Sequence, residues 1–190
     1  MKNSIFIIIL ATIIFPQTLI AQNWIYQPNK SQLNWVGKAA FSAYTLSGTI
    51  QLKSAALIMD NESIQTGKFV VDMKTIISKM KDLTKHLKSK DFFEVKKYKT
   101  ATFELTELTI NEGGEQMAKG QLTVKNITKP ITFLITQHVV DNQLSVKGKA
   151  IINRTAFGIT FNSPSFFKKM KDQAIADDFE LGFELVFLRE

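Results

Sequence analysis

Residues 179–187 read FELGFELVF, and this stretch decides the fold class. Apolar side chains occupy every second position from Phe179 to Phe187, while Glu180 and Glu184 stand between them. An alternation with a period of two is typical of a strand with one buried face and one wet face, as in antiparallel sheets. The end of the chain is therefore predicted to be an antiparallel β-strand.

The same alternation fills most of the chain before this stretch. About eight strands joined by short turns predict an all-β sandwich or a closed up-and-down barrel. Numerous bulky inward residues, and strands free of proline, favour an eight-stranded antiparallel barrel. The alternating runs are residues 46–52, 68–73, 103–106, 122–124, 131–135 and 144–152, and turn residues stand at Asp60-Asn61, Asn111–Gly114, Asn126–Pro130 and Asp141-Asn142.

One segment has helical spacing instead of alternation. Lysines flank its apolar stripe and Ser78 is the expected N-cap, so the sequence predicts one amphipathic, cationic helix inserted around residues 76–89. The stripe is formed by Ile76, Met80, Leu83 and Leu87.

A second interruption covers residues 162–178, where we expect a long loop or a short helix. Large exposed apolar patches are uncommon on soluble monomers. Phe166 and Phe167 are therefore expected to pack beneath the end of the barrel.

The composition excludes several kinds of chemistry. The 190 residues, 45% hydrophobic and 22% charged, suit one globular domain, and the absence of cysteine excludes disulfides, thiolate metal sites and cysteine nucleophiles. Asp82 and His86 share one helix face, but two ligands do not complete a zinc site, and His138 has no acidic neighbour. Asp177 and Asp178 are adjacent, so in a strand they point to opposite faces. We expect no catalytic residue, no metal, no cofactor and no enzymatic activity.

Residues 1–21 have the pattern of a secretory signal peptide. Lys2 is followed by an apolar run and then by the small residue Ala21. We expect cleavage between Ala21 and Gln22, which leaves one domain at residues 22–190 in the periplasm or outside the cell.

The formal net charge of +7 comes mainly from one segment. Residues 74–99 contain nine lysines and three acidic residues, and the rest of the mature chain is balanced. The near absence of arginine and the expected export argue against a nucleic-acid partner. The lysines either form a solvated face or border a cavity mouth, where they attract anionic lipid headgroups or a membrane surface.

Several stretches resemble the YceI-like proteins, in the same order and over nearly the whole mature chain. They are IYQPNKSQLNWVGK at residues 25–38, HLKSKDFFEVKKYKTATFEL at 86–105, GQLTVKNITKPITF at 120–133, INRTAFGI at 152–159 and DDFELGFELVFL at 177–188.

The resemblance implies an eight-stranded antiparallel, lipocalin-like barrel in the periplasm, with an elongated apolar cavity. It implies a carrier or sequestering protein for a long-chain isoprenoid lipid, of the quinone or prenyl phosphate type, or for a fatty amphiphile. Many relatives have a histidine before the glycine that opens the second strand, whereas this chain has Ser47 before Gly48. A histidine-dependent role at that end is therefore not carried over.

The inner faces of the strands supply the expected ligand-binding residues, with Phe92 and Phe93 as a gate at one end. Arg154 continues the inward series of Ala150 and Ile152. Its guanidinium is expected at a barrel end, facing a phosphate, a carboxylate headgroup or a buried protein acid. The expected cavity wall consists of Phe69, Val71, Phe103, Leu105, Phe133, Ile135 and Phe183.

Two alternatives stay open at this point. An eight-stranded barrel is wide enough either for packed side chains or for one small ligand, so the same phenylalanines would also suit a filled core. A filled barrel would bind a protein or an anionic membrane surface through its lysine-rich helix. A hydrolase or isomerase on the same scaffold is disfavoured because the catalytic groups are missing. The oligomeric state is open, a dimer included.

Overall fold

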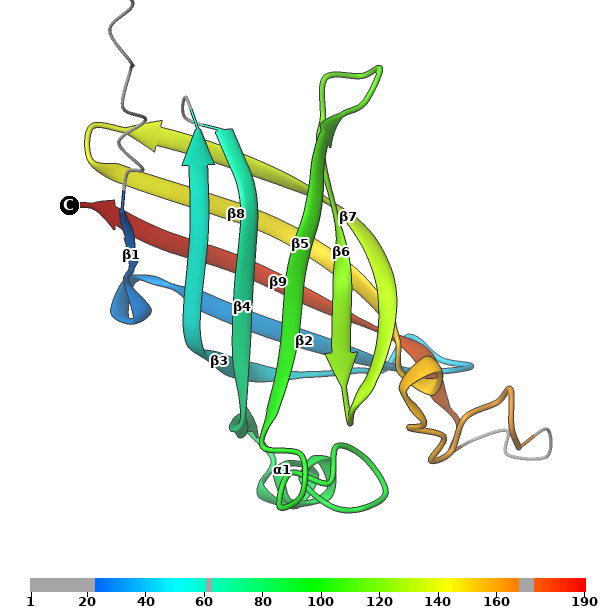
Figure 1. The fold of residues 1–190 in the computed structure, drawn as a ribbon. Helices are drawn as coiled ribbons and strands as arrows, with labels where there is room; N and C mark the ends of the chain where they lie inside the picture. Colours follow the sequence, from blue (N-terminus) through cyan, green and yellow to red (C-terminus); the bar gives the residue numbers. More distant parts are fainter. Residues whose placement is uncertain (1–22, 61–62, 168–172) are drawn as a thin grey trace, which may run out of the picture.

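The computed structural model describes residues 23–60, 63–167 and 173–190 and shows a closed antiparallel barrel (Figure 1). Within these residues, eight strands from β2 to β9 pair in chain order, and β9 closes the barrel by pairing with both β8 and β2. The predicted eight-stranded, lipocalin-like barrel is confirmed. Its strands are β2 (Gln32–Ala39), β3 (Thr45–Asp60), β4 (Ser63–Ser78), β5 (Thr100–Ile110), β6 (Gln116–Val124), β7 (Ile127–Val140), β8 (Gln143–Asn153) and β9 (Ile175–Arg189).

Shorter elements complete the chain. β1 (Trp24–Tyr26) pairs with the end of β9, and a short 3-10 helix, η1 (Pro28–Lys30), leads from it into β2. The helix α1 (Lys81–Leu87) lies between β4 and β5, and η2 (Arg154–Phe157) follows β8. In the part of the chain that the structure describes, no helix is both long enough and apolar enough to cross a membrane. The expected signal peptide and its cleavage site lie outside the described residues.

Because neighbouring strands are antiparallel, their connections gather at two ends of the barrel (Figure 1). The β2–β3 connection, α1 and the connection from β8 to β9 lie at one end, called here the α1 end. The end of β3, the start of β4, and the β5–β6 and β7–β8 connections lie at the other end, called here the far end. The two ends differ in how their interiors are packed.

The far end has a tightly packed interior. Leu144 on β8 and Phe187 on β9 are paired residues of neighbouring strands, and both are completely buried. Trp24 and Met59 are buried in the same core. These side chains therefore pack the interior near this end.

Two aromatic rings in the middle of the barrel lie against glycines of neighbouring strands. A Cβ at Gly120 would lie 2.5 Å from the ring of Phe103, and a Cβ at Gly148 would lie 2.5 Å from the ring of Phe183. Real side chains do not approach so closely. Glycine at these positions therefore lets both rings lie close to the barrel wall.

The predicted helix is confirmed in place but wrong in its boundary. It begins at Lys81, and Ile76 belongs to β4. The register of β4 against β3 shifts between Gln51 and Thr49, and the hydroxyl of Thr75 accepts a hydrogen bond from the backbone N–H of Gln51. This bulge breaks the alternation and imitates helical spacing. The hydroxyl of Ser78, the expected N-cap, accepts a hydrogen bond from the N–H of Met80 outside the helix.

Two further expectations are wrong. Phe166 and Phe167 are 58% and 48% exposed, whereas Phe161 packs against the core in their place. Pro130 lies inside β7, opposite Gln121, because the preceding turn consists of Lys125 and Asn126 alone. Both turn residues have positive φ, as two-residue hairpin turns of the primed types require.

Candidate functional site

The α1 end of the barrel encloses a cavity of about 270 Å³, called here the mouth cavity. Its walls are apolar and come from strands on several sides and from Leu83 and Leu87 of α1. The amphipathic character of α1 explains its place, because the helix turns this apolar stripe inward and leaves Lys81 and Lys85 exposed. The helix therefore forms one side of the cavity.

Polar side chains are found where this cavity meets solvent. Two exposed residues that line the cavity are Lys38, near the end of β2, and Tyr44, in the β2–β3 connection. Gln173 and Asp178, near the start of β9, are also exposed and line the cavity. The backbone N–H of Ala40 donates to the carbonyl of Ala174 over 2.8 Å, which ties these two segments together. The opening thus has a polar border around an apolar interior.

A second cavity of about 100 Å³, called here the inner cavity, lies deeper in the barrel. Its wall includes a row of four phenylalanine rings from β4, β5, β7 and β9. Ring centroids are 6.1 Å apart between Phe69 and Phe103, 5.2 Å between Phe103 and Phe133, and 5.8 Å between Phe133 and Phe183. All four side chains are only partly buried because they face the cavity.

The two cavities share part of their lining, so they lie one behind the other along the barrel. Because the structure contains both cavities, the interior of the barrel is not a completely filled core. The shared side chains are Val71, Leu122, Ile152 and Leu181.

The predicted wall residues are distributed over the two cavities. Phe92, Phe93 and Arg154 line the mouth cavity, and Val71 lines both. Phe92 is buried beneath α1, and the side-chain ammonium group of Lys125 donates to its carbonyl oxygen over 3.0 Å. The inner cavity is lined by Phe69, Phe103, Leu105, Phe133, Ile135 and Phe183.

Sequence reasoning missed several lining residues. Leu46, Phe179 and Leu181 lie on runs whose alternation was recognised, and that alternation could have identified them. Lys38 and Tyr44 carry no such signal, since their position depends on where the β2–β3 connection meets β9.

Arg154 faces protein groups at the end of β8. Its Nε donates to the carbonyl of Ala176 over 3.0 Å, and its two terminal nitrogens donate to the carbonyls of Ile159 and Ile175 over 2.9 Å each. The guanidinium also lies 3.7 Å from a carboxylate oxygen of Asp177. Burial lowers the pKa of Arg154, and the charge of Asp177 opposes this shift. Arg154 therefore fastens the connection between β8 and β9.

Asp177 completes this cluster from β9. It accepts hydrogen bonds from the hydroxyls of Ser163 and Ser165. Burial alone would raise the pKa of Asp177, but these hydrogen bonds and the positive charge of Arg154 outweigh it and hold the pKa below its ordinary value of 3.8. Its neighbour Asp178 lines the mouth cavity instead.

The lowered pKa of Asp177 predicts a loss of stability in acid. A carboxyl group with a lowered folded-state pKa stabilises the fold above its unfolded pKa, and this contribution is lost as the pH falls through the folded value. In the Asp177→Asn protein, the free energy of unfolding is therefore expected to decrease less steeply than in the unchanged protein as the pH falls below 3.8. Urea unfolding over a series of pH values measures this, with exposed Asp91→Asn as the control. An equally steep acid loss in Asp177→Asn and the unchanged protein would contradict the assignment.

The two histidines lie in different surroundings. His86 is not half of a surface pair with Asp82, because its ring packs edge-on against Phe161 and Phe92, with centroids 4.6 Å and 5.0 Å away. His138 is exposed on β7. Among residues 23–60, 63–167 and 173–190, no three acidic or histidine side chains lie close enough together to hold a metal ion.

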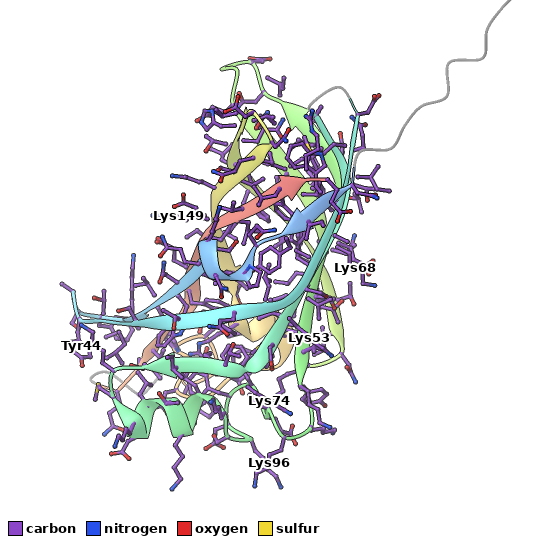
Figure 2. All side chains as sticks on the ribbon, turned by 90° about the vertical axis from the view of Figure 1, so that its left-hand side faces the viewer. Tyr44, Lys53, Lys68, Lys74, Lys96 and Lys149 are labelled. Atoms are coloured by element: carbon purple, nitrogen blue, oxygen red, sulfur yellow. The ribbon has the colours of Figure 1, made fainter. Side chains whose placement is uncertain are left out.

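The segment from Lys74 to Lys99 lies at the α1 end (Figure 2, where Lys74 and Lys96 are labelled near α1). Its lysines line neither the mouth cavity nor the inner cavity. The lysine that lines the mouth cavity is Lys38, which lies outside this segment. The segment therefore places positive charge outside the opening rather than inside it.

Comparison with known proteins gives one consistent result. A family model described as a YceI-like domain matches residues 24–187. A UPF0312 protein of Vibrio cholerae is 40% identical over 63 residues, which is 33% of this chain and 33% of that protein, so the chain matches about a third of the length of that relative.

Solved structures share the fold. BcnA of Burkholderia cenocepacia superposes with a TM-score of 0.72 at 21% identity and covers 85% of this chain and 98% of its own. A polyisoprenoid binding domain from Saccharophagus degradans superposes with a TM-score of 0.65 at 10% identity, over 89% of this chain and 99% of its own.

Proposed function

Because the chain belongs to the YceI-like family, we propose that it is a non-enzymatic protein that carries or sequesters a long-chain isoprenoid or similar amphipathic lipid. The observation that carries this proposal is an apolar cavity with a polar border that continues inward past Val71. Removing an apolar tail from water contributes about 0.8 kcal/mol per buried methylene group. The tail would lie among the inward phenylalanines and the headgroup would remain at the opening.

The border of the mouth cavity restricts the headgroup. Lys38 carries a positive charge, Tyr44 a hydroxyl group that donates and accepts hydrogen bonds, and Asp178 a negative charge. Lys38 and Asp178 balance in charge, and the charge of Arg154 is paired with Asp177. A neutral quinone-type headgroup therefore fits the opening at least as well as a prenyl phosphate. The proposed place of action is the periplasm or the cell exterior, after cleavage near Ala21-Gln22.

Native mass spectrometry of gently purified protein tests this function directly. We expect a fraction of the protein to carry a mass that corresponds to one long-chain lipid, released by organic extraction and identified by its fragments. Protein that stays without bound lipid, and that binds neither geranylgeraniol nor N-phenyl-1-naphthylamine when these are added, would contradict the proposal.

Val71→Phe is expected to weaken lipid binding without unfolding the barrel. Val71 lines both cavities, so a larger side chain there blocks the passage between them. Loss of about two buried methylene groups corresponds to a roughly tenfold weaker affinity. Fluorescence titration with N-phenyl-1-naphthylamine, and competition by geranylgeraniol, measure the change.

Val70→Phe is the matched control, because Val70 is adjacent on β4 and lines neither cavity. It should leave the affinity unchanged, and urea unfolding should show that both variants are folded. Equal affinity in the Val71→Phe and Val70→Phe proteins would show that the ligand does not occupy the barrel.

A further inference from the structure

Four aromatic side chains at the α1 end are exposed to solvent and are called here the aromatic rim. Phe41 is 69% exposed and Tyr44 is 58% exposed, both in the β2–β3 connection. Phe166 and Phe167, in the connection from β8 to β9, are exposed to similar extents. Tyr44, labelled in Figure 2, also lines the mouth cavity, so the rim adjoins the opening at this residue.

Contacts within the protein hold the two halves of the rim at this place. The N–H groups of Phe166 and Phe167 both donate to the carbonyl of Ser163, and the Ser163 hydroxyl donates to Asp177 on β9. On the other side, Ala40 donates to Ala174, just before β9. The rings are therefore presented outward from two anchored connections at one end of the barrel.

The far end of the barrel differs in both chemistry and charge. Its large exposed apolar residues are aliphatic, among them Ile58, Ile110 and Val140. Its turns carry the acidic residues Asp60, Glu112, Glu115 and Asp141, whereas the α1 end carries the nine lysines of residues 74–99. The molecule is thus positive and aromatic around the opening, and negative at the opposite end.

We propose that the α1 end docks on an anionic lipid bilayer, with the aromatic rim in the headgroup region and the lysines of residues 74–99 facing lipid phosphates. Aromatic side chains favour the membrane–water interface, and lysines near an anionic surface add attraction. The opening of the mouth cavity would then face the bilayer, so that a lipid tail passes between them without crossing water. That last step rests on the proposed lipid-binding function, whereas docking does not.

Flotation with vesicles of phosphatidylglycerol and phosphatidylcholine tests the docking. Replacing Phe41 and Phe167 together by serine is expected to reduce the vesicle partition coefficient roughly tenfold, because the apolar contribution is lost. Ile110→Ser with Val140→Ser is the matched control, with two exposed apolar side chains removed from the far end, and should leave the coefficient unchanged. Replacing Lys81, Lys85 and Lys88 by glutamine should reduce the partition coefficient roughly fivefold per lysine at low salt. With vesicles of pure phosphatidylcholine, the same replacement should change the coefficient little.

Equal partition of the rim variant and the far-end variant would overturn the proposal, and so would binding that ignores vesicle charge. Titration with N-phenyl-1-naphthylamine in the absence of vesicles keeps the two proposals apart, because the replaced side chains line neither cavity. Unchanged dye binding together with lost flotation supports docking. Lost dye binding with unchanged flotation would instead count against the rim as the docking surface.

Discussion

Arg154→Met is expected to lower the free energy of unfolding by about 3–5 kcal/mol, the range found when one partner of a buried charged network is removed. Arg154 is 3% exposed, and its guanidinium donates to the carbonyls of Ile159, Ile175 and Ala176. Methionine fills a similar space but leaves these carbonyls without their donors and the Asp177 carboxylate without its positive partner. Urea unfolding followed by circular dichroism measures the loss.

Two further variants test whether the loss of stability comes from burial and from the geometry of the guanidinium group. Lys149→Met removes an ion pair with Glu180, 3.0 Å away on the outer face, and should cost less than about 1 kcal/mol. Arg154→Lys should recover little, because one ammonium group cannot reproduce donors on three nitrogens that point to three carbonyls. Full stability in the Arg154→Lys protein would show that charge alone matters here and that the geometry of the guanidinium does not.

Gly48→Ala is expected to lower the free energy of unfolding by about 3 kcal/mol or more, at the upper end of the cost of overpacking. A Cβ at Gly48 would lie 1.8 Å from the carbonyl oxygen of Ile77 and 2.6 Å from the ring of Trp35. That same carbonyl accepts the indole N–H of Trp35 over 3.2 Å. The added methyl group must therefore separate β3 from β4 and displace the indole. Urea unfolding followed by tryptophan fluorescence records both effects.

Gly37→Ala is the matched control on the neighbouring strand. A Cβ at Gly37 would meet no atom within 4 Å, so this variant should keep its stability or gain about 0.4–1 kcal/mol from the restricted unfolded chain. Comparable losses in the two variants would mean that general sheet propensity, rather than the close approach of Ile77 and Trp35, decides the cost.

Much of the fold could be predicted because local alternation and global burial agree. The run ending in Phe187 is one unbroken strand, and the other alternating runs became strands of the same barrel. The prediction was wrong where a β-bulge or a short turn interrupts the alternation of apolar and polar residues. The bulge before Ile76 imitates a helical turn, and a two-residue turn at Lys125 and Asn126 leaves Pro130 inside a strand. Neither device can be recognised from the spacing of apolar residues.

The candidate site was predictable in its side-chain types but not in its shape. Parity along the strands places Phe103 and Phe183 inside, yet it does not show whether such rings fill the barrel or leave it hollow. That outcome depends on the neighbouring strands, where Gly120 and Gly148 let the rings lie against the wall. The partners of Arg154 could not be predicted either, because they are backbone carbonyls brought together only by folding.

The closure of the barrel by β9 has a consequence for the order of folding. β9 follows the other strands of the barrel along the chain, and it pairs with β8, β2 and β1. Until the 15 residues of β9 are available, β2 and β8 both present unpaired edges, which are sites of aggregation. The pair Gln32 and Glu184 joins distant parts of the chain, so closure carries a large entropic cost and is intrinsically slow. Closure of the barrel therefore has to wait for the synthesis of β9.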